Sequence, residues 1–543
     1  MPAHTGSSGP SRRTFLAAGA VAAAGAAVPL LSSCSTATVA KNTAAANAKA
    51  KLPTYAPVDV VRPDLPGTTR GAMAGYFSYP RHPKPAFSTP PLAGVGDVSI
   101  IYPTYSAVPP RPGNNAFWQQ LDKGAGAKLD ITLATGGDYP TKFQTLIAGG
   151  DLPDIVGFPV PTPDQPQVME KLFADLGPYL SGDAAKEFPY LANIPTDSWK
   201  SAVANGTIYA VPQPRALPLN PLFARIDIIK QLGANPEPKS YQDFLQLMKD
   251  VTDAKKSRWA FADVWGMVTH LQMMLGVPNT WDDRGGKFVS FWTDERTKQA
   301  VGLVRSMVKQ GLFHPDAASA TAQFTPLRDY FTSGRTVMTS DGYAAWDIFG
   351  RQIGYDKVTA LVEPKYAGGG DAKHYAGTGS QGLTVIRKGL GEKKTRALVN
   401  LLNWLCAPIG TAEHLQRKFG VEGVDYTWKD GLPTPTSRGA RELVDVQYIT
   451  DAPTIIGPGA KAEVTAQHTW HVRVTNNLIA NPAVGRYSDT NSRKGAQLKK
   501  ITDDAQLDIA FGRRPLSDWD DVIKQWRSAG GDKMSAEYAE SAT

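Results

Sequence analysis

The chain has 543 residues, of which 42% are hydrophobic and 20% are charged, and its formal net charge is +8. This is the composition of a soluble globular protein, and a mild positive charge without a dense Lys/Arg block does not indicate nucleic-acid binding. The chain contains only two cysteines, which excludes a framework of disulfides. The length exceeds what one hydrophobic core usually covers, so at least two lobes are expected.

The first residues predict an export signal. Arg12 and Arg13 precede an uncharged apolar run at residues 16–31, which is shorter than the roughly 20 residues of a membrane-spanning helix. The letters SRRTFL resemble a twin-arginine signal, and LSSC resembles a lipobox whose Cys34 is lipidated. We therefore expect a signal peptide at 1–33 and a flexible tether at 34–57. The alternative is a single N-terminal membrane anchor with an incidental cysteine.

Strands and helices alternate once the tether ends. Residues 58–96 are rich in Pro and Gly without a hydrophobic period, so they predict an extended segment that packs across the surface. Beyond them, short apolar runs rich in β-branched residues alternate with helical segments, which is typical of parallel β-α-β units. The strands are expected near residues 97–103, 129–133 and 154–158, and the helices near 115–123 and 140–148.

Three later features are informative. Ser240, followed by Asp243 at the capping-box distance, predicts the N-terminus of a helix. The turn at 377–382, GTGSQG, is rich in glycine and leads into a strand. Cys406 lies among leucines at helical spacing, which predicts a buried core thiol.

Five segments in order carry a family resemblance. They are YPTKFQTLIAGGDLPDIV, FADLGPYL, NGTIYAVPQP, ARIDIIKQLGANPEPKSYQDF and YFTSGRTVMTSDGYAAW. Together, behind the lipoprotein-like leader, they resemble the extracellular solute-binding lipoproteins of ABC importers, in particular the large carbohydrate-binding branch related to maltose-binding protein.

The resemblance implies an α/β fold of the type II periplasmic-binding-protein class. Two lobes are joined by a hinge, and the ligand binds in a cleft at their interface. The chain is expected to cross between lobes near residues 209–214 and again near 377–386. The first lobe is then expected to contain residues 97–212 with about 377–430. The second is expected to contain 213–376 with about 431–543, including the C-terminal helices.

Three stretches of the sequence bear on cofactor or metal binding. The GTGSQG turn fits G-x-G-x-x-G, but it precedes a strand, whereas a dinucleotide site needs that turn to open a helix. His468 and His471 lie three residues apart without a nearby cysteine or an obvious carboxylate to complete a zinc site. The stretch after Asp250 has too few oxygen ligands for a calcium loop. No cofactor and no metal are therefore expected.

A site that binds a sugar needs flat aromatic rings for the C–H faces and planar polar groups for the hydroxyls. Such residues should follow the strands, at the carboxyl edge of each sheet. The first lobe and the crossing offer Tyr105, Asp138, Phe158, Gln213 and Arg215. The second lobe and the return crossing offer Trp265, Trp281, Asp341, Tyr343, Trp346 and Tyr375.

These observations predict a receptor and not an enzyme. We expect a monomer, exported by the twin-arginine route and anchored by lipid to the outer face of the cell membrane. It should deliver a sugar or oligosaccharide to the membrane permease of an ABC importer, by hinge closure without catalysis. Two alternatives stay open: a secreted carbohydrate-active enzyme such as a lyase or hydrolase, and a receptor for peptides or another polar solute.

Overall fold

The computed structural model describes residues 42–105, 107–321 and 323–541. The predicted signal peptide and Cys34 lie outside these residues. Within the described part, no helix is both long and apolar enough to span a bilayer.

A five-stranded sheet with the order β2-β1-β3-β13-β6 forms the centre of the first lobe. β1 pairs in parallel with both β2 and β3, so that Ile100 lies between Ile131 and Ile155. β13 returns antiparallel between β3 and β6. The predicted parallel β-α-β units are therefore confirmed. The strands are β1 Val98–Thr104, β2 Leu129–Thr135, β3 Ile155–Phe158, β6 Ala210–Pro214 and β13 Ser380–Ile386.

Helices and their buried faces complete the first core. α2 begins where the Asn115 side chain accepts a hydrogen bond from the Trp118 N–H, and it ends at Gly126 in a left-handed conformation, as glycine permits. On α14, Leu398, Leu402 and their neighbours are fully buried against the sheet. The helices of this lobe are α2 Ala116–Ala125, α3 Tyr139–Gly149, α4 Gln165–Leu172, α5 Gly177–Leu180, α6 Pro189–Ala192, α14 Glu392–Leu405, α15 Ala412–Phe419 and α16 Ser437–Glu442.

The predicted core thiol is confirmed. Cys406 follows α14, is completely buried, and its Sγ lies 3.3 Å from Thr450 Oγ1. Burial raises the pKa of this thiol to about 12, so it stays a neutral packing group at physiological pH.

A smaller sheet organises the second lobe. β7 lies between β10 and β11 and is antiparallel to both. The predicted cap of α8 is confirmed, because Ser240 Oγ accepts the Asp243 N–H at 3.2 Å. The elements are β7 Leu222–Arg225, β10 Met338–Ser340, β11 Val358–Leu361, α7 Ile226–Gln231, α8 Tyr241–Val251, α9 Val264–Leu275, α10 Glu295–Lys309, α11 Ala317–Ala320, α12 Phe324–Thr332, α13 Ala345–Ile353 and α17 Lys461–Thr475.

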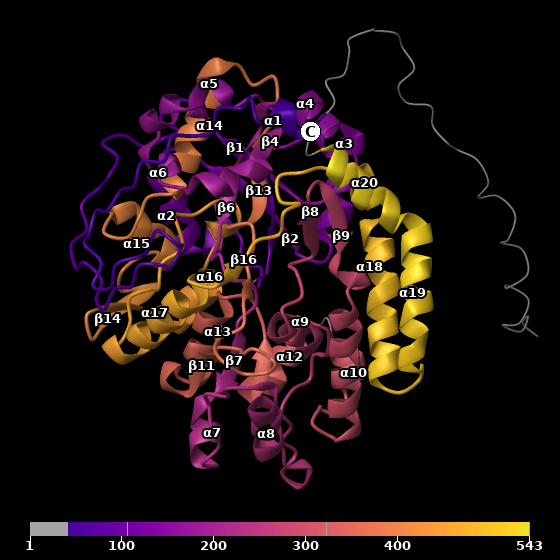
Figure 1. Cartoon of the computed structure of the whole chain (residues 1–543). Coiled ribbons are helices and arrows are strands. Elements are labelled where there is room, and N and C mark those ends of the chain that lie inside the picture. Colours follow the sequence, from indigo (N-terminus) through magenta and orange to yellow (C-terminus); the bar gives the residue numbers. More distant parts are fainter. Residues whose placement is uncertain (1–41, 106, 322, 542–543) are drawn as a thin grey trace, which may run out of the picture. The chain divides into compact units, whose positions relative to one another are not determined.

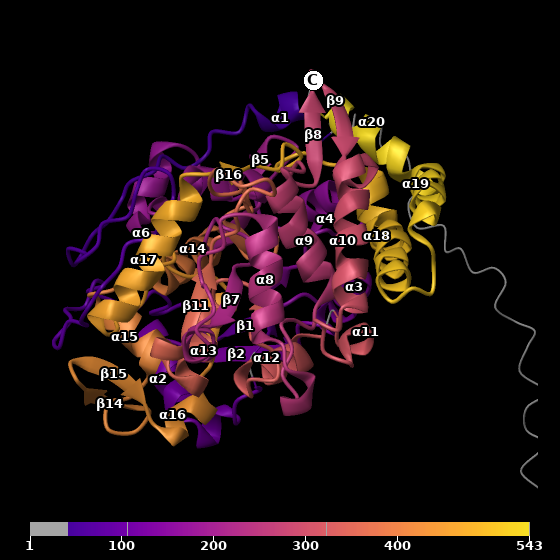
Figure 2. The ribbon, with the colours of Figure 1, turned by 60° about the horizontal axis from the view of Figure 1, so that its bottom comes forward.

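The C-terminal helices extend the core of the second lobe. α18 packs along α9 and α10, with Ala505 and Ile509 buried against them. Figures 1 and 2 show α18 and α19, in yellow, running alongside α10. The β8–β9 hairpin lies next to α20. The bounds are α18 Asp489–Ala510, α19 Trp519–Trp526, α20 Asp532–Glu540, β8 Trp281–Arg284 and β9 Lys287–Ser290.

Short elements complete the described chain. The two-stranded pairs are β4–β5, β12–β16 and β14–β15. Their bounds are β4 Val203–Ala204, β5 Thr207–Ile208, β12 His374–Tyr375, β14 Tyr426–Lys429, β15 Leu432–Pro435 and β16 Leu478–Ile479, and α1 spans Ala44–Asn47.

The N-terminal segment is a strap that contacts both lobes. Residues 42–57, expected to belong to the tether, are bound along the first lobe in the structure, where Thr54 N–H donates to Gly182 O at 3.0 Å. Residues 58–96 contain no helix or strand, as expected of an extended segment. They leave the first lobe after Val58, whose N–H donates to Asn193 Oδ1 at 3.1 Å, and reach α17, where His468 Nε2 lies 2.9 Å from Pro66 O. They then return to the first lobe, where the Glu413 carboxylate accepts the Ala86 N–H at 3.0 Å.

Candidate functional site

Two of the chain segments that connect the lobes pair with each other. The first leads from β6 to β7, and the second leads from β12 to β13. Gly377 N–H donates to Leu217 O at 2.7 Å, and Leu219 N–H donates to Tyr375 O at 2.9 Å. Gly379 has a φ of 69°, which glycine adopts readily. The glycine-rich turn at 377–382 is therefore part of an antiparallel ribbon between the lobes.

Polar side chains of the second lobe hold this ribbon in place. Asn279 Nδ2 donates to Ala376 O at 2.8 Å and to Ile479 O at 2.9 Å. Glu363 is buried close by, with an oxygen 2.6 Å from His270 Nδ1. Burial alone would raise the pKa of Glu363, but hydrogen bonds from His270 and His374 outweigh burial and hold this pKa well below its usual value. Glu363 is therefore a carboxylate that neighbouring donors stabilise.

Arg215 is fixed where the first crossing leaves β6. Its Nε donates to Gln381 Oε1 at 2.7 Å, and its Nη1 donates to Pro214 O at 2.8 Å. The guanidinium carbon lies 5.5 Å from the centre of the Tyr448 ring. Because two fixed acceptors hold the guanidinium, its remaining N–H groups have a defined direction.

Tyr105 follows β1 and is 53% exposed, which is unusual for a tyrosine beside a core. Its ring centre lies 5.0 Å from that of Tyr448. The ring also lies against Gly136, where a Cβ would come within 2.7 Å of Tyr105 Cδ1. Gly136 therefore leaves the space that the tyrosine ring occupies.

The second lobe contributes a planar ion pair. Asp341 follows β10, is only 6% exposed, and accepts two hydrogen bonds from Arg328. The distances are 2.7 Å from Nε to Oδ2 and 3.1 Å from Nη2 to Oδ1. Asp341 Oδ1 also accepts the Gly342 N–H at 2.7 Å. This bidentate geometry orients Arg328, which comes from α12.

Tyr448, in the first lobe, lies within electrostatic range of Arg328 in the second lobe. Burial and the nearby Asp445 carboxylate raise the pKa of its phenol, Arg215 and Arg328 oppose that increase, and Tyr105 adds to it. Arg328, from the second lobe, thus acts on a tyrosine of the first lobe. We call Tyr105, Arg215, Arg328, Asp341, Gln381 and Tyr448 the interlobe cluster.

Buried polar side chains connect β6 to β13 close to the interlobe cluster. Gln213, on β6, donates from Nε2 to Thr384 Oγ1 at 3.4 Å, and its N–H donates to Ser380 Oγ at 3.2 Å. Gln213 is almost completely buried. It therefore acts in the structure as a link between β6 and β13.

Two predicted site residues lie in hydrophobic cores. Phe158 is enclosed in the first core, with its ring centre 5.1 Å from that of Phe143. β3 is buried on both faces, so the last residue of this strand points inward. Trp346 lies in a core of the second lobe, 5.6 Å from Phe223 in an edge-to-face arrangement.

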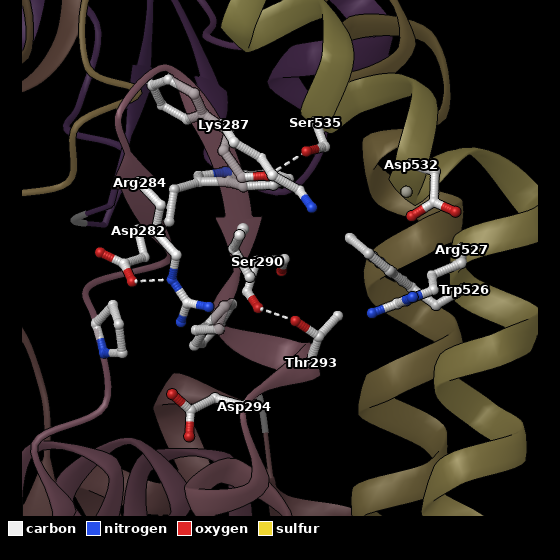
Figure 3. Close-up of a pocket in the computed structure, with 16 residues that line it drawn as sticks. Asp282, Arg284, Lys287, Ser290, Thr293, Asp294, Trp526, Arg527, Asp532 and Ser535 are labelled. Carbon is white, nitrogen blue, oxygen red and sulfur yellow. Dashed lines mark hydrogen bonds and ion pairs between the residues drawn. The ribbon is translucent and has the colours of Figure 1, made fainter.

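The other predicted residues lie apart from the interlobe cluster, each with a local partner. Asp138 Oδ2 accepts the Thr135 hydroxyl at 2.6 Å, and Trp265 Nε1 donates to Asp503 O at 3.2 Å. The hydroxyl of Tyr343 donates to Gln467 at 2.7 Å, and that of Tyr375 donates to Val277 O at 3.1 Å. Trp281 lines a cavity of the second lobe (Figure 3).

Sequence reasoning missed Tyr448, Arg328 and Gln381. Tyr448 lies in a short 3-10 turn, Val446–Tyr448, that carries no periodic pattern. Arg328 lies on an amphipathic helix, where an arginine is normally read as a solvated residue. The one available signal was the position of Gln381 within the glycine-rich turn at residues 377–382.

A second contact joins the lobes away from the ribbon. The Arg493 guanidinium, on α18, forms an ion pair with Asp164, which precedes α4. Arg493 also pairs with Asp489 at 3.0 Å. Both side chains of the interlobe pair are about half exposed, so the pair is open to solvent.

The interlobe cluster combines aromatic rings with fixed polar groups. Tyr105 and Tyr448 offer ring faces, and Arg215 and Arg328 offer oriented donors. Within the part of the chain that the structure describes, no group of three or more His, Cys, Asp or Glu side chains is arranged to hold a metal ion.

Comparison with known families decides the affiliation of the chain. The model of the bacterial extracellular solute-binding protein family matches residues 111–402. The chain belongs to this family. The expected family membership and the α/β fold with two lobes are both confirmed.

Curated relatives extend over most of the chain. Lipoprotein LipO of Bacillus subtilis is 23% identical over 478 residues, which cover 80% of this solute-binding protein and 90% of the relative. The polygalacturonan/rhamnogalacturonan-binding protein YtcQ of Bacillus subtilis is also 23% identical, over 455 residues, covering 79% and 88%. Among solved structures, the N-glycan transport solute-binding protein of Streptococcus pneumoniae superposes with a TM-score of 0.61. It shares 16% identity and covers 82% of this chain and 99% of its own.

Proposed function

We propose that this solute-binding protein is the receptor of an ABC importer for a sugar or oligosaccharide, which it binds by closure of its lobes without catalysis. The observation that carries the proposal is the interlobe cluster. Tyr105 and Arg215 lie against Tyr448 in one lobe, and Arg328, which is paired with Asp341 in the other lobe, interacts electrostatically with Tyr448. A ligand held by both halves stabilises their approach.

The residue types suit a carbohydrate. Sugar rings present C–H faces that pack on aromatic rings, and hydroxyl groups that pair with planar donors and acceptors. The names of two relatives, one a polygalacturonan/rhamnogalacturonan-binding protein and one an N-glycan transport protein, support the same ligand class. The first of these names also directs the ligand screen toward pectic oligosaccharides.

The leader supports a location outside the cell. We propose export by the twin-arginine route, lipidation at Cys34 and attachment to the outer face of the membrane. The family description, which is extracellular, and the relative named a lipoprotein agree with this location. A permease in the same membrane would then receive the ligand.

The two lobes follow from the cores. We propose that the first lobe comprises residues 97–212 and the part after the return crossing at 377–386, whereas the second is built around β7, β10 and β11. Val444, Val446 and Ile449 pack in the first core. The chain therefore makes a third crossing after residue 449, before α17 packs on the second lobe.

Calorimetry with a panel of neutral and acidic oligosaccharides tests the proposal. Tyr448→Ala and Arg215→Ala should each weaken binding at least tenfold, whereas Tyr55→Ala, at an exposed tyrosine of the strap, should not. A ligand at a hundredfold over its Kd should stabilise the native state by about 2.7 kcal/mol.

The same panel separates a receptor from an enzyme. Recovered ligands should be unchanged after prolonged incubation, as judged by mass spectrometry. Shortened products would overturn the absence of catalysis. Binding of short peptides in place of every glycan would overturn the ligand class.

A further inference from the structure

A cavity of about 370 Å³ opens in the second lobe, away from the interlobe cluster. One wall is the β8–β9 hairpin with the turn at residues 291–293. The other wall is the end of α19, a π-type turn at Arg527–Gly531 and the start of α20 (Figure 3). No residue of the interlobe cluster lines it. Its volume lies within the range of small-molecule sites.

Aromatic rings that are each at most 5% exposed form the closed floor of the cavity. The ring centres of Trp281 and Trp526, which come from opposite walls, lie 6.5 Å apart. Phe288 adds a third ring, 6.4 Å from Trp281. At Gly531 a Cβ would come within 2.7 Å of Trp526 Cδ2, so the backbone can lie against this ring only because residue 531 is glycine. Trp281, which we predicted as a ligand contact, therefore belongs to this cavity.

The charged groups of the lining fall into two kinds. Arg284 is paired with Asp282 at 2.8 Å, and Asp294 is held by Arg296. Among the described residues, by contrast, neither Lys287 nor Arg527 has a hydrogen-bonding or ion-pair partner. Figure 3 shows these two side chains extending into the cavity from opposite walls.

We propose that this cavity is a second ligand site, which binds a sugar that carries a carboxylate. The carboxylate lies between Lys287 and Arg527, and the apolar face of the sugar ring packs against Phe291, the partly exposed aromatic residue of the lining. Asp532, which also lines the cavity without a partner among the described residues, accepts hydrogen bonds from ring hydroxyls.

The lining distinguishes a sugar acid from a simple anion. A small oxyanion would use the two cations but not the apolar part of the lining, and the Asp532 carboxylate would repel an anion that carries two charges on a single centre. A neutral sugar would leave both cations without a partner. A sugar with one carboxylate on each ring, hydroxyl groups and an apolar face uses every part of the lining.

A neighbouring cavity extends the site. It has a volume of about 210 Å³ and shares Thr293, Asp294 and Arg527 with the first. Its lining adds Trp292 and Trp519. A second sugar unit has space there, so a uronate disaccharide should bind more tightly than the monosaccharide.

The test uses the full chain with the interlobe cluster disabled by Arg215→Gln and Tyr448→Ala. Calorimetric titration with digalacturonate should still detect one site. Adding Lys287→Gln or Arg527→Gln should weaken that binding at least tenfold. Lys533→Gln, which removes the same charge one residue beyond Asp532 and outside the cavity lining, should leave it unchanged.

Control ligands define the chemistry. Digalactoside, the neutral counterpart, should bind at least tenfold more weakly than digalacturonate. Inorganic phosphate that binds as tightly as digalacturonate, and is lost in the same variants, would overturn the assignment to a sugar. Absence of any binding in the cluster-disabled protein, or equal binding by Lys287→Gln, Arg527→Gln and Lys533→Gln, would overturn the site itself. Because the cluster is disabled throughout, these outcomes are independent of the proposed function.

Discussion

The substitution Gly136→Ala should weaken ligand binding without weakening the fold. A Cβ at this position would lie 2.7 Å from Tyr105 Cδ1, whereas carbon atoms in contact are normally about 3.5–4.0 Å apart. Tyr105 Cε1 would lie closer still, so the exposed ring must move by more than about 1 Å away from its present position beside Tyr448. Because the ring is more than half exposed, it can move without disturbing the core.

The magnitude follows from the loss of one aromatic stacking contact. Aromatic pairs contribute about 0.5–1.5 kcal/mol beyond their buried area, which corresponds to an increase in Kd of about two- to twelvefold. The free energy of unfolding should not fall by more than about 0.5 kcal/mol, as for surface substitutions elsewhere. Isothermal titration calorimetry and thermal unfolding measure the two quantities.

The chain offers a matched control at the next position. Gly137 has no atom within 4 Å of an added Cβ, so Gly137→Ala changes the backbone in the same way without touching Tyr105. Equal Kd values for the two variants would refute the role of the Tyr105 ring. A large loss of stability in Gly136→Ala alone would show that this ring belongs to the fold and not to a ligand surface.

Three further predictions concern stability and closure. Trp404→Ala, at a buried position of α14, should lower the free energy of unfolding by about 3–5 kcal/mol, measured by urea denaturation. Asp451→Asn should cost about 3–5 kcal/mol because it leaves the buried Arg417 without its charge partner. Asp164→Asn should remove the exposed interlobe pair with Arg493 and weaken ligand binding by less than about 1 kcal/mol, an effect that should vanish at high salt.

The Asp451 prediction also has a pH dependence. Burial raises the pKa of this carboxyl, but Arg417 and Lys418 outweigh burial and hold it well below its usual range. The ion pair therefore stabilises the native state above the unfolded pKa of about 3.9 and is lost progressively as the pH falls below that value. Asp451→Asn should flatten the stability curve below about pH 4. Parallel acid denaturation curves for the two proteins would contradict this account.

Much of the fold was predictable because its determinants are local. The apolar, β-branched runs at β1 and β3 predict buried strands from the local sequence alone. The helices between them are marked by residues such as Asn115 and Gly126 at their ends. Parallel pairing then follows from the alternation of strands and helices. The family resemblance supplied the two lobes, which periodicity alone does not establish.

The candidate site was less predictable because its residues meet only in three dimensions. Tyr105 and Asp341 directly follow strands. The expectation that ligand-binding residues follow strands, at the carboxyl edge of each sheet, therefore identified both as candidates. Phe158 also ends a strand, but β3 is buried on both faces, and the sequence does not reveal which way its last ring points. Tyr448 and Arg328 come from a 3-10 turn and a helix surface, 120 residues apart along the chain, and neither segment carries a motif.

The strap has a mechanical consequence for the two lobes. It is bonded to the first lobe at Thr54, reaches α17 at Pro66 and is bonded to the first lobe again at Ala86. A change in the distance between the lobes would therefore have to stretch this segment or break one of these contacts.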